Sequence, residues 1–297
     1  MPFWCVALLV TAAVAQSQDS KLPQVSAEDL VRETVAQEIA ASNDTTVKHM
    51  FRSRKQTARG TQTRLYVETN DAMAGMLVAM NDQPLSTQQK QAEQGHLDWL
   101  MDNPDQLRKK HAREKEDAQR SLQIVRALPD AFRYQYDGVE VGDAERGKPG
   151  EQLVRLKFTP NPSYSPPSHV EQVLQGMQGT LLIDPAEHRI ALMDGTLFRD
   201  VSFGWGILGH LDKGGHFLVQ QADVGDDCWE MTGMDLKITG KILLFKAISL
   251  ISDETLSDFR RVPDNLPFAK GVELLRSEQQ KLAHLREPEA LPSQKTP

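Results

Sequence analysis

Residues 179–197 read Gly-Thr-Leu-Leu-Ile-Asp-Pro-Ala-Glu-His-Arg-Ile-Ala-Leu-Met-Asp-Gly-Thr-Leu. Apolar residues at 181–183 and at 190–192 flank the dipeptide Asp184-Pro185, which is a strong turn signal. The segment therefore predicts two adjacent strands joined by a short turn. Such a connection requires the two strands to run antiparallel.

The same organisation extends from Pro129 to Val262. Apolar residues alternate in short runs that turn signals separate at intervals of roughly 8 to 12 residues. We expect strands at Phe132–Tyr136, Val154–Phe158, Leu197–Trp205, Phe217–Val219 and Trp229–Met231, and a strand pair over Leu236–Ile251. We expect turns at Gly142–Gly150, Asp212–Gly215 and Gly225–Asp227, and a proline-rich loop at Pro160–Pro167. Consecutive strands without intervening helices predict an antiparallel meander.

The region before this meander predicts a helix, then strands, then more helix. Ser26 followed by Asp29 resembles a capping box, and apolar residues at four-residue spacing predict a helix over about 26–41. From Thr45 the apolar period changes to two, which predicts two or three strands. A helical excursion follows at about 86–128: we predict two helices there, inserted between the two groups of strands, with Asn103-Pro104 between them.

The second helix of this excursion has an unusual middle. Residues 108–117 read Arg-Lys-Lys-His-Ala-Arg-Glu-Lys-Glu-Asp and contain no apolar stripe. Such a run cannot be buried. We therefore predict that residues 105–120 project into solvent as a charged helix.

A last helix is predicted from about Pro267 to Leu285, followed by a disordered tail at 287–297 with Pro288 and Pro292. We divide the chain into a signal peptide (1–15), a linker (16–25), a half-barrel domain (26–262), a C-terminal helical segment (263–286) and the tail. The predicted class is α+β: a large curved antiparallel sheet, an incomplete β-barrel, with helices covering its concave side.

The N-terminus predicts export. Met1 to Ala15 carry no charged side chain, and the apolar run ends in the small-x-small triplet Ala13-Val14-Ala15. The run is too short to span a membrane, so we expect a cleaved signal peptide and a periplasmic protein. The alternative is a buried N-terminal helix. Cleavage would remove Cys5 and leave Cys228 as the only cysteine, which excludes an intramolecular disulfide.

The formal net charge of −7 over 297 residues excludes a basic nucleic-acid-binding protein. Residues 204–209 match the dinucleotide-binding pattern G-x-G-x-x-G, but Gly214-Gly215 leaves no room for the helix that this site requires. A bent or bulged strand is the better interpretation.

Two further groups contain residue types that could form a chemical site. If the turn at 212–215 joins a hairpin, His210 and His216 lie on opposite faces of the sheet and cannot share a metal. Cys228 has acidic neighbours, which disfavour the thiolate, so we interpret it as a small buried hydrophobe and not as a nucleophile. We predict no catalytic residue, no metal site and no cofactor.

The strongest indication of a ligand is the run Ile242–Phe245, which is apolar on both faces of its strand and needs cover on each side. The cover is either the terminal helices or a bound apolar molecule. Large apolar side chains on the late strands are the candidate lining of such a cavity: Trp205, Phe217, Trp229, Leu243 and Phe245.

Three segments together resemble a group of secreted bacterial proteins called outer membrane lipoprotein-sorting proteins. These segments are Gly179–Ile190, Asp194–Leu197 and Asp212–Phe217. The group is similar to the periplasmic lipoprotein carrier and its outer-membrane receptor, and the likeness extends loosely over 26–262. The resemblance implies a curved sheet partly closed by helices around an apolar cavity that holds acyl chains. It assigns no individual residue.

The expected function is therefore non-enzymatic binding of an apolar ligand, a lipid or lipoprotein acyl chain, in outer-membrane lipoprotein or lipid trafficking. Peripheral contact with a membrane fits this expectation. The alternative is an envelope scaffold whose cavity is filled by its own side chains and binds no ligand. A hydrolase with a dispersed triad is a third alternative, since one sequence does not reveal such triads.

Overall fold

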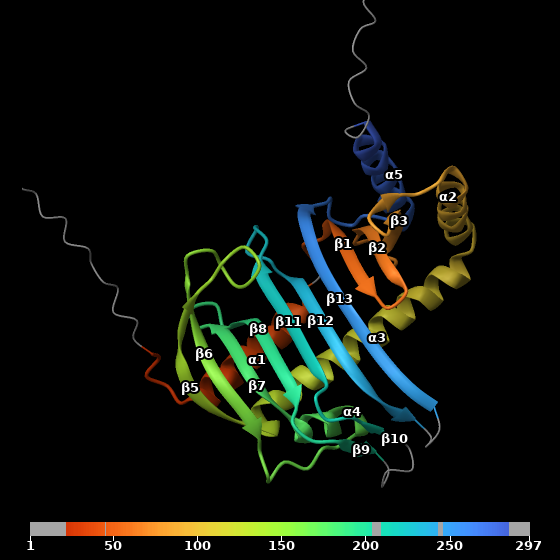
Figure 1. The fold of residues 1–297 in the computed structure, drawn as a ribbon. Coiled ribbons are helices and arrows are strands. Elements are labelled where there is room, and N and C mark those ends of the chain that lie inside the picture. The colour runs from red at the N-terminus through yellow and green to blue at the C-terminus, as the bar shows by residue number, and fades with distance from the viewer. Residues whose placement is uncertain (1–21, 45, 204–208, 243–245, 285–297) are drawn as a thin grey trace, which may run out of the picture.

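A computed structural model of the chain describes residues 22–44, 46–203, 209–242 and 246–284 (Figure 1). These residues form an open antiparallel sheet of 13 strands with five α-helices and one 3-10 turn, which confirms the α+β class. The helices are α1 (Ala27–Asn43), α2 (Thr87–Asp102), α3 (Pro104–Ala131), α4 (His169–Gln172) and α5 (Phe268–His284), and the 3-10 turn is η1 (Val173–Gly176). In the described part of the chain, no helix has the length and apolar character needed to cross a bilayer.

The strands fall into two groups along the chain. The first group is β1 (His49–Thr57), β2 (Gly60–Val67), β3 (Ala74–Met80) and β4 (Gln83–Pro84). The second is β5 (Phe132–Val141), β6 (Gln152–Pro160), β7 (Met177–Asp184), β8 (Arg189–Leu197), β9 (Val201–Phe203), β10 (Gly209–Leu211), β11 (His216–Asp223), β12 (Trp229–Ile242) and β13 (Lys246–Arg261). The main path of the sheet is β4-β3-β2-β1-β13-β12-β11-β8-β7-β6-β5, so the last strand joins the two groups by pairing with β1.

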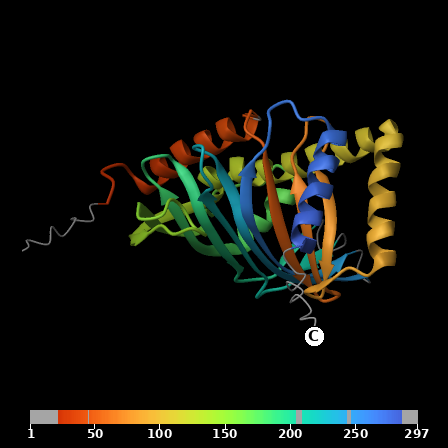
Figure 2. The same ribbon diagram turned by 90° about the horizontal axis from the view of Figure 1, so that it is seen from above.

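Helix α1 and the C-terminal part of α3 pack on one face of strands β5–β8, which we call the inner face (Figure 2). Ser26 caps α1 by accepting a hydrogen bond from the backbone N–H of Asp29, as the capping pattern predicts. The core below contains Leu30 and Val31 of α1 and Leu156, Phe158 and other alternating strand residues, all almost fully buried. This half of the inner face is therefore filled by the protein's own side chains.

Helix α5 packs on the opposite face of the sheet, over β2 and β3. Met50 and Val67 are register partners and pack in a cluster with Val272 and Leu275 of α5. The next pair along these strands, Phe51 and Tyr66, points to the inner face because successive side chains of a strand alternate. Helix α5 thus leaves the inner face of β1–β3 uncovered.

Helix α3 runs along the inner side from α2 to the filled half of the sheet (Figure 1). Its 28 residues rise about 42 Å, and its fully buried residues are all at the C-terminal end, from Ala127 to Ala131. The middle is exposed, as predicted, but it spans the inner face between two packed ends instead of projecting away. The helix also continues past Leu128 to Ala131 and so includes Pro129, where the sequence predicted its end.

The structure corrects three details of the predicted meander. Residues 229–242 form one 14-residue strand, β12, where two separate strands were predicted. The predicted strand Leu197–Trp205 is divided, since β8 ends at Leu197 and β9 starts at Val201. The turn at 212–215 does not close a hairpin, because the strands before and after it, β10 and β11, both pair with β12.

This last correction changes the placement of His210 and His216. Their partners on β12 are Lys241 and Lys237, four residues apart, so both histidines lie on the same face and not on opposite faces. Four residues of strand separate them by roughly 13 Å, which still prevents them from sharing a metal ion.

Candidate functional site

The five apolar candidates from the sequence do not gather in one place within the described residues. Phe217 is half-buried on the inner face, where its ring lies over Gly195 and packs against the main core. Trp229 is buried in a separate cluster with Leu182 and Leu192 on the opposite face. Trp205, Leu243 and Phe245 lie outside the described residues. The structure therefore does not bring Phe217 and Trp229 together.

A different cavity opens on the uncovered half of the inner face. It has a volume of about 500 Å³ and lies between β2–β3, α2 and α3; we call it the α2–α3 cavity. Protein pockets that bind small molecules typically have volumes of about 300–1,000 Å³. The lining residues are Arg64, Tyr66, Gly75, His96, Trp99, Leu100, Gln106, Lys109, Lys110, Arg113, Glu114 and Asp117.

Aromatic rings form part of this lining. The ring of Tyr66 lies over Gly75, its register partner on β3, where a Cβ atom would come within 2.6 Å of the ring. Trp99 stacks on His96 with ring centroids 6.1 Å apart and remains 46% exposed. Tyr66 also stacks on Phe51, which stacks on Phe259. The cavity therefore adjoins a continuous aromatic strip.

The wall formed by α3 is basic. Of the lining side chains on α3, three are basic and two are acidic, and Arg64 of β2 adds a fourth basic side chain. Lys110 pairs with Glu114, and Arg64 lies 3.4 Å from a carboxylate oxygen of Glu93. In the described part of the chain, no carboxylate lies within ion-pair distance of Lys109 or Arg113. These two residues, one turn apart on α3, offer unneutralised positive charge to the cavity.

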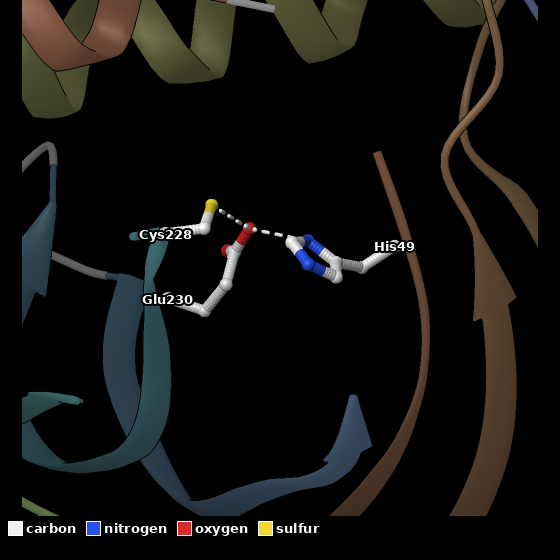
Figure 3. A group of neighbouring side chains, drawn as sticks. All are labelled: His49, Cys228 and Glu230. Carbon is white, nitrogen blue, oxygen red and sulfur yellow. Dashed lines mark hydrogen bonds and ion pairs between the residues drawn. The ribbon is translucent and has the colours of Figure 1, made fainter. Parts of the chain in front are cut away.

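A second polar arrangement lies where the sheet divides. Strands β12 and β13 pair only from Gly233 and Thr255 onward, although β12 begins at Trp229 and β13 continues to Arg261. A cavity of about 450 Å³ marks this division; its lining includes Thr232 on one strand and Ser257 on the other. Near the same place, the side chains of His49, Cys228 and Glu230 point toward one another (Figure 3).

The distances in this trio are short. His49 Nδ1 lies 3.2 Å from Glu230 Oε1, and the Cys228 thiol donates a hydrogen bond to the same oxygen over 3.7 Å. His49 is the first residue of β1, and its backbone N–H donates to Glu68 Oε2 at 2.8 Å. Cys228 ends the turn that begins at Gly225, and Glu230 is two residues further along. The i, i+2 spacing places Cys228 and Glu230 on the same side of the chain.

These contacts shift three ionisations. The hydrogen bond to Glu230 raises the pKa of His49, and burial raises the pKa of Glu68. Burial, reinforced by the charge of Glu230, raises the pKa of the Cys228 thiol to about 12. The thiol is therefore protonated at neutral pH and is a poor nucleophile, as its acidic neighbours predict.

The sequence alone predicted neither the α2–α3 cavity nor the cluster of His49, Cys228 and Glu230. His49 and Glu230 are 181 residues apart in the chain, and only the sheet order brings them together. Cys228 is only partly buried, and its hydrogen bond to Glu230 corrects the interpretation as a simple hydrophobe. The local signal was the pair Cys-x-Glu at a strand start. The sequence identifies α3 only as a charged helix, so it does not indicate the α2–α3 cavity that this helix lines.

The comparisons with known proteins are sparse. No family model and no curated protein matches the chain. Among solved structures, the chain is similar to a domain from Vibrio parahaemolyticus that is described as an outer membrane lipoprotein-sorting protein. The two are 11% identical, the match covers 82% of this chain and 97% of that one, and the TM-score is 0.28. This domain belongs to the group that the sequence resembles.

Proposed function

We propose that this protein is a non-enzymatic, periplasmic binding protein that holds a lipid or a lipoprotein acyl chain on the inner face of its half-barrel. The α2–α3 cavity is the observation that supports this proposal. Its aromatic lining offers apolar contact at about 0.8 kcal/mol for each buried CH₂ group. The basic wall of α3 adds attraction for an anionic group, so the preferred ligand is an acyl chain with a carboxylate or phosphate at one end.

The position of the cavity fits the packing of the rest of the molecule. The core under α1 leaves no room for an acyl chain, since Leu30, Leu156 and Phe158 are each at most 1% exposed. The aromatic strip of Phe51, Tyr66 and Phe259 lies on the other half of the inner face, where Phe51 is buried between the other two rings and Tyr66 lines the α2–α3 cavity. We place the anionic group against Lys109 and Arg113, and the chain along this strip. Phe217 lies on the same face and remains a candidate for contact with the far end of the chain.

The filled core also favours a second candidate function, the envelope scaffold without a ligand. In that case Tyr66 and its neighbours pack only against the protein. The two functions differ in what a polar substitution does. For a binding protein, Tyr66→Asn weakens ligand binding and leaves a cooperative thermal transition; for a scaffold, it lowers stability by several kcal/mol through a cavity and an unsatisfied amide.

Dye displacement tests the binding proposal. The full chain, purified from the periplasm, should bind the apolar dye N-phenyl-1-naphthylamine and release it when oleate or phosphatidylglycerol is added. Native mass spectrometry of the same preparation should show co-purified lipid. A wild-type protein that binds no dye and carries no lipid would contradict the proposal.

Charge reversal on α3 locates the site. Arg113→Glu should weaken oleate binding at least tenfold, because it replaces a lining cation with a repelling carboxylate. Lys115→Glu is the matched control: it makes the same charge change two residues away, at an exposed position outside the cavity lining. Equal effects of the two variants would show that only the overall charge matters.

Export is tested separately. The predicted signal peptide lies outside the described part of the chain. N-terminal sequencing of the mature protein should begin at Gln16. An intact Met1 on protein from the cytoplasm would contradict the periplasmic assignment.

A further inference from the structure

We propose that His49, Cys228 and Glu230 form a zinc site that links β1 to the start of β12, where β12 and β13 divide. The sequence predicted no metal site, and the proposal depends on the three-dimensional arrangement alone. It is independent of the lipid-binding proposal, because none of the three residues lines the α2–α3 cavity.

The ligand types fit zinc. A thiolate, an imidazole nitrogen and a carboxylate oxygen are the three ligand kinds that zinc uses in proteins. The thiolate disfavours calcium and magnesium, which prefer all-oxygen sites. One thiolate and one carboxylate also balance the double positive charge of the ion.

The distances fit a tetrahedral ion. With Zn–N near 2.0 Å, Zn–O near 2.0 Å and Zn–S near 2.3 Å, tetrahedral angles place N and O about 3.3 Å apart and S and O about 3.5 Å apart. The observed separations are 3.2 Å from His49 Nδ1 to Glu230 Oε1 and 3.7 Å from Cys228 Sγ to the same oxygen. All three ligand atoms lie within 4.8 Å of one another. Binding therefore requires small shifts of side chains and no movement of a strand.

The surroundings support the histidine and leave one position open. His49 is 2% exposed, its backbone is fixed by reciprocal hydrogen bonds with Glu68, and its ring packs edge-on against Phe259. Glu68 adds negative charge beside the site. The side chain of Glu230 is 27% exposed, which gives the ion a path from solvent. Water would supply the fourth ligand.

His216 shows that a histidine beside two carboxylates is not sufficient for a zinc site. Its Nε2 lies 2.9 Å from Asp194, and its Nδ1 lies 3.4 Å from Asp235. The two carboxylates therefore face opposite sides of the ring, so no single ion reaches all three groups. His216→Gln is accordingly a matched control for His49→Gln.

Metal binding to the chelator-treated full chain tests the proposal. We expect one zinc ion per chain by isothermal titration calorimetry and elemental analysis, with release of the Cys228 proton detected in buffers of different ionisation enthalpy. Cobalt should replace zinc and give a thiolate-to-cobalt charge-transfer band in the near ultraviolet. Cys228→Ser should abolish this band, and both Cys228→Ser and Glu230→Gln should weaken zinc binding at least tenfold.

The proposal can be tested even if His49→Gln fails to fold. The cobalt band of the wild type, and the loss of this band in Cys228→Ser, do not depend on that variant. His216→Gln should bind zinc like the wild type. Absence of stoichiometric zinc binding at 100 µM free zinc, or a cobalt spectrum without a thiolate band, would overturn the proposal. A loss of affinity in His216→Gln as large as that in Cys228→Ser would overturn it as well.

Discussion

Arg189 at the start of β8 forms a two-point ion pair with Glu38 of α1: Nε lies 3.1 Å from Oε1, and Nη2 lies 3.2 Å from Oε2. Glu38 Oε1 also accepts a hydrogen bond from the backbone N–H of Ile190 at 2.7 Å. Both side chains are about 90% buried, and the guanidinium lies 5.5 Å from the ring centroid of Trp229. This pair connects α1 to the start of β8.

Removal of one partner of this pair should be costly. Glu38→Ala leaves a buried guanidinium and a buried N–H without an acceptor, so we expect a loss of about 3 kcal/mol in the free energy of unfolding by urea denaturation. The exposed pair Arg32–Asp29 on the same helix supplies the comparison, and Arg32→Gln should cost less than ~0.5 kcal/mol. Similar small losses in both variants would mean that solvent reaches the Glu38 pair.

Cys228 should be slow to react with alkylating reagents. A rise of the thiol pKa from 9.0 to about 12 lowers the thiolate fraction at pH 8 by roughly a factor of 1000. We therefore expect alkylation of native, metal-free protein by iodoacetamide to be at least ~100-fold slower than in 6 M urea. Glu230→Gln should accelerate the native reaction. A native rate equal to the denatured rate would contradict the arrangement around Cys228.

The stability of the metal-free protein should depend on pH through His49. The pKa of His49 is raised in the folded state, so the folded protein binds this proton more tightly than the unfolded chain. The resulting stabilisation is fully present below about pH 6.5 and is lost as the pH rises through the folded-state pKa. Thermal melts should show a smaller decrease of stability from pH 6 to pH 8 for His49→Gln than for the wild type. Parallel pH profiles would rule out this contribution.

The middle of α3 should contribute little to stability except at Glu114. Lys109→Gln combined with Glu116→Gln should change the free energy of unfolding by less than ~0.5 kcal/mol, because both side chains are exposed. Glu114→Gln should cost more, about 1 kcal/mol, since Glu114 accepts a hydrogen bond from the backbone N–H of Met73 and pairs with Lys110. Losses of several kcal/mol in the double variant would show that the helix packs into the core.

Much of the fold could be predicted because local patterns specify it. The capping pair Ser26 and Asp29, the break at Asn103-Pro104 and the turn at Asp184-Pro185 all mark real boundaries. Alternation in β5 to β8 also identified the inner core residues, such as Leu156 and Leu181. These features depend on neighbours within a few residues, which is the range that a single sequence reports.

The relations that were missed depend on pairing over long distances. Nothing near His210 indicates that β10 and β11 share β12 as a partner, so a hairpin was the local expectation. Alternation predicted a shared face for Phe217 and Trp229, but the two residues belong to different core clusters, and the residues around each do not reveal this. The α2–α3 cavity likewise combines Tyr66 with Arg113, residues whose proximity follows only from where α3 crosses the sheet.

The position of β13 in the sheet also affects how the chain folds. Strand β1 has no partner on one side until β13 arrives, and Met50 and Arg260, which pair there, are separated by 210 residues. Pairing at such a distance requires closure of a very long loop, which slows folding and leaves a strand edge open to other chains in the meantime. During synthesis, the strands within residues 49–84 cannot join the rest of the sheet until the C-terminal strand β13 has been made. A truncated chain that ends before residue 246 would keep this edge exposed and should be prone to aggregate.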